Sequence, residues 1–191
     1  MKTLSLLRLA LSLVAAFAIC CSLPATAADN PIVRLATTIG NIDIELYPDK
    51  APLTVSNFLQ LVDEGFYDGL IFHRVIAGFM IQGGGYDSDL QHRQPPGTIA
   101  NESHNRLPNQ KGSIAMARLA DPDSASTQFY INVSHNPNLD ATLDRPGYTV
   151  FGQVTAGMEV VAEIELVATH LEAGMSDVPV EDVIINQATR R

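Results

Sequence analysis

The chain has 191 residues, of which 46% are hydrophobic and 17% are charged, and its formal net charge is −9. This length fits one domain with its own core, and the apolar content excludes a mostly disordered chain. The acidic balance argues against a nucleic-acid partner, because a phosphate backbone binds basic surfaces.

The first segment has the pattern of a secretory signal. Lys2 and Arg8 accompany an apolar run that reaches to about Leu23, and small residues follow around Ala27. A basic start, an apolar stretch and a small-residue cleavage site together predict that residues 1–27 are a signal peptide.

Two alternatives compete with a signal peptide. One is a membrane anchor, for which the apolar run is shorter than the ~20 residues that a spanning helix needs. The other is a lipid anchor on Cys20 or Cys21, although neither cysteine follows the small residue that is usual at such sites. Cleavage after Ala27 would remove both cysteines, so the exported domain, residues 28–191, would have no thiol for a disulfide or a nucleophile.

Two strands joined by a short turn are predicted at the start of this domain, over residues 32–38 and 41–47. In the second strand, Ile42, Ile44 and Leu46 alternate with acidic residues. This two-residue period is typical of a strand with one face in the core and the other in water.

Two helices are predicted from their apolar spacing. The first begins at Pro52, a residue common in a first helical turn, and ends at Gly65. Its apolar stripe has the spacing i, i+3, i+4, i+7 and consists of Val55, Phe58, Leu59 and Val62. The second helix covers residues 158–165, with apolar side chains facing inward and glutamates facing outward.

The rest of the domain alternates short apolar runs with long polar stretches. The β-rich runs are 70–75, 79–82, 113–117, 128–133, 148–154 and 183–187. About eight short strands and two helices predict a mainly β fold, a closed eight-stranded antiparallel β-barrel capped by two α-helices. Closure would remove exposed strand edges, which suits an exported domain without disulfides.

Four sequence blocks carry the functional signal. They are 72–84 (FHRVIAGFMIQGG), 112–118 (GSIAMAR), 126–132 (STQFYIN), and 138–140 (NLD) with 148–152 (YTVFG). A strand through Arg74 would send Phe72 to the same face and the histidine between them to the other face. A bend at Gly78 would bring the neighbours Phe79 and Met80 toward one pocket.

These four blocks resemble the cyclophilin family of peptidyl-prolyl cis-trans isomerases in its bacterial form, in order and spacing from about Ile32 to Thr189. The resemblance implies an eight-stranded barrel with two helices and a site on its outer surface. It also implies that Arg74 is the catalytic residue. The substrate-binding positions that it implies are Phe79, Met80, Gln82, Ala117, Arg118, Gln128, Tyr130, Leu139 and Tyr148.

Three positions depart from the usual pattern of the family. Tyr130 stands where Phe is common, so the ring is kept and a hydroxyl is added. Asn138 stands where many members have an aromatic residue, and we expect this change to weaken cyclosporin-type inhibitors more than catalysis. Tyr148 stands where His is frequent, and its hydroxyl can keep a polar role.

The implied reaction needs no nucleophile, metal or cofactor. Amide resonance gives the X-Pro bond a barrier of ~18–20 kcal/mol, and twisting the bond localises a lone pair on the proline nitrogen. A guanidinium at Arg74 would stabilise that twisted form more than either planar form. The histidines show no metal-ligand spacing, so we expect no metal site, and His73 is predicted to be structural.

The sequence therefore predicts a periplasmic isomerase that accelerates X-Pro steps in the folding of other exported proteins. Its expected partners are unfolded or extended polypeptides that contain proline, bound by a monomer with no nucleic acid and no membrane contact after signal removal. The alternative is a non-catalytic module or holdase chaperone that grips proline segments. Arg74 favours the enzyme, because gripping needs no cation, whereas Asn138 favours the module, because it leaves the pocket less complete.

Overall fold

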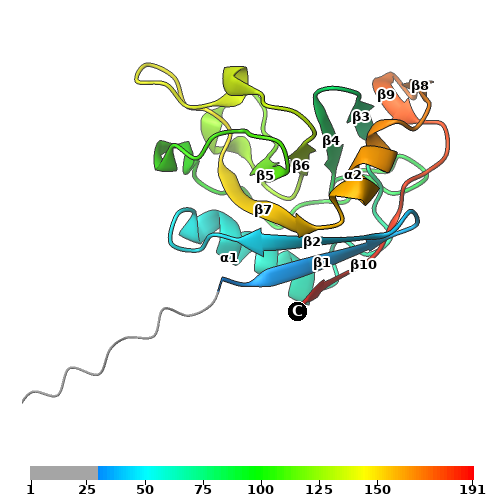
Figure 1. The fold of residues 1–191 in the computed structure, drawn as a ribbon, viewed down its shortest axis with the longest axis horizontal. Coiled ribbons are helices and arrows are strands. Elements are labelled where there is room, and N and C mark those ends of the chain that lie inside the picture. Colours follow the sequence, from blue (N-terminus) through cyan, green and yellow to red (C-terminus); the bar gives the residue numbers. More distant parts are fainter. Residues whose placement is uncertain (1–29) are drawn as a thin grey trace, which may run out of the picture.

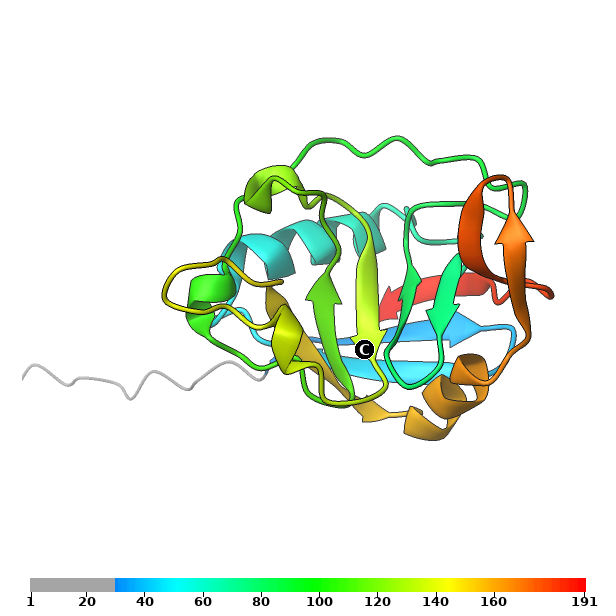
Figure 2. The ribbon, with the colours of Figure 1, turned by 90° about the horizontal axis from the view of Figure 1, so that it is seen from above.

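A computed structural model describes residues 30–191, in which a curled sheet surrounds the core and two helices lie on opposite sides of it (Figures 1 and 2). The predicted signal peptide, residues 1–27, lies outside the described residues. The helices are α1 (Pro52–Asp63) and α2 (Met158–Glu165), with single 3-10 turns at Ser103–Asn105, Pro122–Ser124 and Pro137–Leu139. The strands are β1 (Ile32–Thr37), β2 (Asn41–Leu46), β3 (Arg74–Ile76), β4 (Met80–Gly83), β5 (Ser113–Met116), β6 (Phe129–Asn132), β7 (Val150–Ala156), β8 (Thr169–Glu172), β9 (Met175–Pro179) and β10 (Ile185–Arg190).

The predicted closed barrel is wrong, because the main sheet is a strongly curled half-barrel that stays open. Its eight antiparallel strands follow the order β10-β1-β2-β7-β5-β6-β4-β3, which leaves β10 and β3 as edges. The chain just before the three-residue strand β3 meets the start of β10 through single bonds. The Phe72 amide donates to the Val183 carbonyl at 2.9 Å, and the Ile185 amide donates to the Leu70 carbonyl at 2.8 Å. These bonds do not continue as a strand ladder, so the edges approach each other without closing the barrel.

The strands β8 and β9 form a separate hairpin that the sequence analysis missed. All four residues of β8 are exposed, so the segment has no alternation of apolar and polar side chains. Its two-residue turn, Ala173 and Gly174, has φ angles of 49° and 82°. Two positive φ angles are typical of tight hairpin turns, and this Ala-Gly pair was the signal that could have revealed the hairpin. The hairpin lies beside β3 at one side of the molecule (Figure 2).

The helices and the first two strands lie within two residues of their predicted bounds. The alternating residues of β2 are fully buried, as the two-residue period predicts. The apolar stripe of α1 is buried against an aromatic cluster in which the Phe58 ring lies 5.1 Å from Tyr67, 5.7 Å from Phe129 and 5.2 Å from Phe151. Burial of such rings stabilises the fold, and the described residues contain no cysteine that could add a disulfide.

A buried carboxylate, Glu102, holds the first turn of α1. Its oxygens accept hydrogen bonds from the Leu53 amide at 3.0 Å, the Thr54 amide at 2.8 Å and the Thr54 hydroxyl at 2.7 Å. These amides have no partner inside the helix, and a negative group at a helix N-terminus is favourable. Glu102, which lies 48 residues from Thr54 in sequence, therefore fastens the loop before β5 to the start of α1.

We expect Glu102→Ala to lower the free energy of unfolding by about 1–3 kcal/mol, because two amides and a buried hydroxyl lose their acceptor. Urea unfolding of the variant, beside Glu181→Ala at an exposed acidic position, measures this effect. Equal stability of the two variants would contradict the capping role.

His73 is buried beside Tyr86 and lowers the stability of the fold at acidic pH. Its side chain is 4% exposed, its ring lies 4.7 Å from the Tyr86 ring, and its Nδ1 has no hydrogen-bond partner among the described residues. Burial, helped by the positive charge of Arg74, lowers the pKa of His73 to about 4. The folded protein therefore keeps this ring neutral at pH values where the unfolded chain already binds a proton.

Between about pH 6.5 and pH 4, stability should fall by as much as about 3 kcal/mol through His73, since the unfolded state alone takes up the proton. Above about pH 6.5, the usual pKa of histidine, His73 is neutral in both the folded and the unfolded protein and does not change the stability. His73→Phe keeps a ring without a titrating nitrogen, so its unfolding free energy should decline less over this range. Parallel pH curves for the two proteins would show that the assignment is wrong.

Candidate active site

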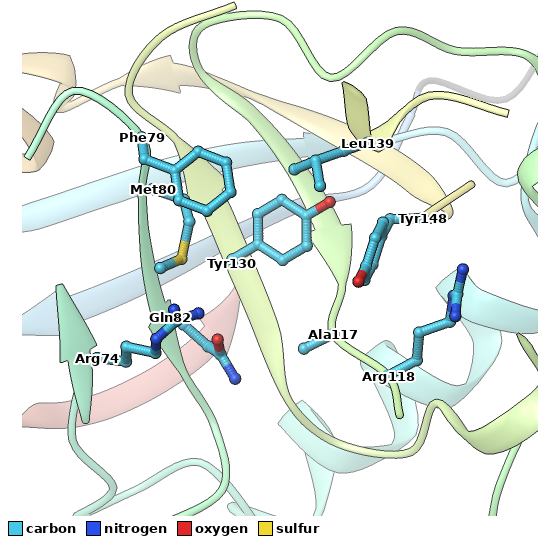
Figure 3. Close-up of a pocket in the computed structure, with 9 residues that line it drawn as sticks. All are labelled: Arg74, Phe79, Met80, Gln82, Ala117, Arg118, Tyr130, Leu139 and Tyr148. Carbon is cyan, nitrogen blue, oxygen red and sulfur yellow. The ribbon is translucent and has the colours of Figure 1, made fainter. Parts of the chain in front are cut away.

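A cavity of about 320 Å³ opens on the outer face of the curled sheet (Figure 3). This volume lies at the lower end of the range for small-molecule sites, about 300–1,000 Å³. The lining residues are Arg74, Phe79, Met80, Gln82, Ala117, Arg118, Tyr130, Leu139 and Tyr148. The structure thus brings together all the residues assigned to the site from the sequence except Gln128, which lines an adjoining hollow.

Strand register explains why these side chains share one face. Arg74 in β3 pairs with Gln82 in β4, Gln82 pairs with Tyr130 in β6, and Tyr130 pairs with Ala115 in β5. Directly paired residues point to the same face of a sheet. Met80 lies two residues before Gln82 and therefore joins the same face.

The neighbouring row faces the opposite way and builds the core. It consists of Val75, Ile81, Ile131 and Ile114, which are paired across the same four strands and are almost fully buried. One set of registers therefore fixes both the apolar interior and the polar outer row. A shift of one residue would exchange the two faces.

The turn between β3 and β4 delivers a second apolar side chain to the cavity. Gly78 has a φ of 71°, so the chain reverses there, and Phe79 and Met80 both line the cavity as the sequence analysis predicted. Two contacts hold this turn in place. The Gly78 amide donates to Glu165 of α2 at 2.7 Å, and the Ser134 hydroxyl donates to the Gly78 carbonyl at 2.6 Å.

One prediction about this segment is wrong. Phe72 was expected to share the face of Arg74, but it is fully buried in the core. The regular strand begins only at Arg74, so the two-residue period does not extend back to Phe72.

A buried polar network lies behind the cavity, and the sequence analysis missed its central residue, Asn109. The Tyr130 hydroxyl donates to Asn109 Oδ1 at 2.7 Å, and Asn132 Nδ2 donates to the same oxygen at 3.2 Å. The Asn109 backbone amide and side chain both donate to Asp140 Oδ1, at 2.7 and 2.9 Å. Asp140 directly follows Leu139, so the network joins the aromatic wall of the cavity to its aliphatic wall. Burial raises the pKa of Tyr130 well above its usual value, which keeps the hydroxyl protonated as a donor.

The two arginines on either side of the cavity (Figure 3) differ in the hydrogen bonds that they already form within the protein. The Arg118 guanidinium lies 4.5 Å from the centre of the Tyr148 ring and donates to the carbonyls of Leu119, Pro146 and Gly147 at 2.9 to 3.3 Å. This side chain therefore fastens two loops together. Its cation already has partners before any substrate arrives.

The Arg74 guanidinium, in contrast, donates no hydrogen bond to any of residues 30–191. Its ionic neighbour is Asp177, whose Oδ2 lies 3.7 Å from Nε, beyond hydrogen-bond distance. The two side chains are 41% and 36% exposed, so this pair is neither buried nor tightly bonded. Arg74 is thus a cation with unused donors at the edge of an apolar cavity.

A glutamine pair extends the outer row beyond the cavity. Gln82 Nε2 donates to Gln128 Oε1 at 2.9 Å, so each amide restricts the orientation of the other. The far side of Gln128 faces a hollow that is also lined by Tyr86 and His92. Gln82 is the member of the pair that can meet a ligand in the cavity itself.

Residues 30–191 contain no group of three His, Cys, Asp or Glu side chains arranged to hold a metal ion. No helix in this part of the chain has the length and apolar character required to cross a membrane.

Comparisons with known proteins agree with this geometry. A model of the family described as "Cyclophilin type peptidyl-prolyl cis-trans isomerase/CLD" matches residues 32–190. The peptidyl-prolyl cis-trans isomerase B of Escherichia coli is 47% identical over 161 residues, which cover 83% of this chain and 98% of that protein. A peptidyl-prolyl cis-trans isomerase of Acinetobacter baylyi is 46% identical over 156 residues, which cover 82% of this chain and 83% of that protein.

A solved structure supports the same family. The crystal structure of a cyclophilin type peptidyl-prolyl cis-trans isomerase from Cryptosporidium parvum superposes with a TM-score of 0.69 at 26% sequence identity. The match covers 85% of this chain and 98% of that chain. Sequence, fold and cavity together lead to one conclusion: the chain belongs to the cyclophilin-type peptidyl-prolyl cis-trans isomerases.

Proposed function

We propose that this protein accelerates the cis-trans isomerisation of X-Pro bonds in exported polypeptides, with Arg74 as the catalytic residue. The observation that carries this proposal is the guanidinium of Arg74, which has unused donors beside a small cavity with apolar walls. The cavity accepts the proline ring, and the arginine acts on the bond that precedes it.

The chemistry follows from the electronic structure of the amide. A planar X-Pro amide delocalises the nitrogen lone pair into the carbonyl, and the resulting rotation barrier is ~18–20 kcal/mol. At the top of the barrier, the bond is twisted and the lone pair is localised on the proline nitrogen. A donor aimed at that nitrogen, or at the carbonyl oxygen of the proline, stabilises the twisted form more than the planar forms. No covalent intermediate is required.

The remaining lining residues bind and orient the substrate. Phe79, Met80 and Leu139 provide apolar contact for the pyrrolidine ring, and the Tyr130 ring lies behind it. Gln82 and the backbone beside Ala117 can hydrogen-bond the flanking peptide, so that one side of the bond is held while the other rotates. This division of roles assigns the charge stabilisation to Arg74, because Arg118, the other charged residue of the lining, is already bonded to the loops.

The cellular role rests on the N-terminal sequence and on the chemistry. The signal pattern over residues 1–27 supports export to the periplasm. Polypeptides that enter this compartment unfolded must isomerise their X-Pro bonds, a step that takes tens to hundreds of seconds without catalysis. An enzyme that binds extended proline segments loosely would remove this delay.

We expect Arg74→Ala to lower kcat/KM by about 10²–10³-fold, as for the loss of a single preorganised donor at other active sites. A protease-coupled assay on a proline peptide measures the rate, and thermal unfolding provides the control, which should match the wild type. Arg74→Lys should fail similarly, since an ammonium lacks the planar fork of a guanidinium. A near-wild-type rate in Arg74→Ala would defeat the proposal. Saturable binding by the wild type without rate enhancement would favour the non-catalytic module.

Tyr130→Phe separates the role of the ring from that of the hydroxyl. The ring remains, so we expect kcat/KM to fall only a few-fold. The lost bond to Asn109 should lower the free energy of unfolding by about 1 kcal/mol. Urea unfolding and the peptide assay, run on the same preparation, measure both quantities. An unchanged unfolding free energy would show that the hydroxyl does not support the network.

A further inference from the structure

We propose that Asp177 is a positioning residue for Arg74. Its carboxylate lies on the Nε side of the guanidinium, 3.7 Å away, and leaves the terminal nitrogens for the substrate. Asp177 lies outside the four sequence blocks and outside the cavity lining, in the β8–β9 hairpin. The inference rests on the proposed function, because it concerns the same arginine.

The backbone of the hairpin is irregular at the point where it presents this side chain. A register shift between His170 and Glu172 places two residues, Ser176 and Asp177, opposite Leu171 alone. Such a bulge redirects a side chain out of the regular alternation of the strand. Asp177 also has a φ of 64°, a left-handed conformation that non-glycine residues rarely adopt and that Asp and Asn tolerate best.

The hairpin lies next to the strand that carries Arg74. β9 packs against β3, whose first residue is Arg74, while the hairpin takes no part in the main sheet (Figure 2). A bulge, a left-handed aspartate and an unbonded arginine therefore meet at one point. Backbone strain of this kind persists where the surrounding structure requires a particular side-chain direction.

The Asp177 carboxylate can orient Arg74 through Nε and leave the terminal N–H groups free to contact the substrate. A free arginine side chain samples many rotamers, and the contact at Nε favours those in which the guanidinium stays at the cavity. The pair is more than one-third exposed on both sides, so water screens the negative charge of Asp177 at the more distant reacting bond. The catalytic gain from orienting Arg74 is therefore larger than the loss caused by the negative charge of Asp177.

Asp177→Asn tests this role, because asparagine keeps the shape and tolerates the left-handed backbone while the charge is lost. We expect kcat to fall about two- to five-fold, the range of an exposed ion pair, with KM and melting temperature unchanged. In ~1 M salt, where the screening length is about 3 Å, the wild-type kcat should fall to that of the variant. The NMR signal of the Arg74 Nε–H, assigned by its absence in Arg74→Lys, should shift in Asp177→Asn.

The matched control is Asp182→Asn, which removes the same charge from an exposed position that forms no ion pair among the described residues. This control should keep the wild-type kcat and its salt response. An unchanged or raised kcat in Asp177→Asn, a change confined to KM, or an equal loss in the control would overturn the inference. If Arg74→Ala is inactive while Asp177→Asn is unaffected, only this inference fails. If Arg74→Ala is active, the proposed function fails.

Discussion

The strand register across β3, β4, β6 and β5 fixes the hydrophobic core and the site together. It places Arg74, Gln82 and Tyr130 in one outward row and, one residue along each strand, a row of valine and isoleucine in the core. Burial of the inner row stabilises the sheet, and the same pairing fixes the outer row. The site therefore needs no separate scaffold, because the core that holds the fold together also orients the functional side chains.

The contrast between Arg74 and Arg118 shows how a preorganised site distributes its charges. Arg118 donates to four backbone carbonyls and stacks on Tyr148, so it stabilises the loops that frame the cavity. The Arg74 guanidinium forms no hydrogen bond among the described residues, and its one acidic neighbour, Asp177, lies just beyond hydrogen-bond distance. Electrostatic stabilisation of a twisted amide requires a cation of the second kind, held beside an apolar surface from which part of the water is excluded.

The sequence predicted those features that depend on local pattern or on the family blocks. The period of Ile42, Ile44 and Leu46 located a strand, and the bend at Gly78 correctly brought Phe79 and Met80 to one cavity. Barrel closure was predicted wrongly, since it depends on whether two distant edges form a ladder. The three residues Glu102, Asn109 and Asp177 were missed for a related reason: their partners lie 21 or more residues away, and nothing in their own neighbourhood marks them.

We infer that the cavity binds the proline segment and that the Arg74 guanidinium accelerates rotation about its X-Pro bond. Exchange NMR on an X-Pro peptide measures both events in one sample, because peptide shifts report binding and cis-trans cross-peaks report turnover. We expect rapid exchange with the wild type, and retained binding with greatly slowed exchange for Arg74→Ala. Equally fast exchange in the presence of Arg74→Ala would contradict it.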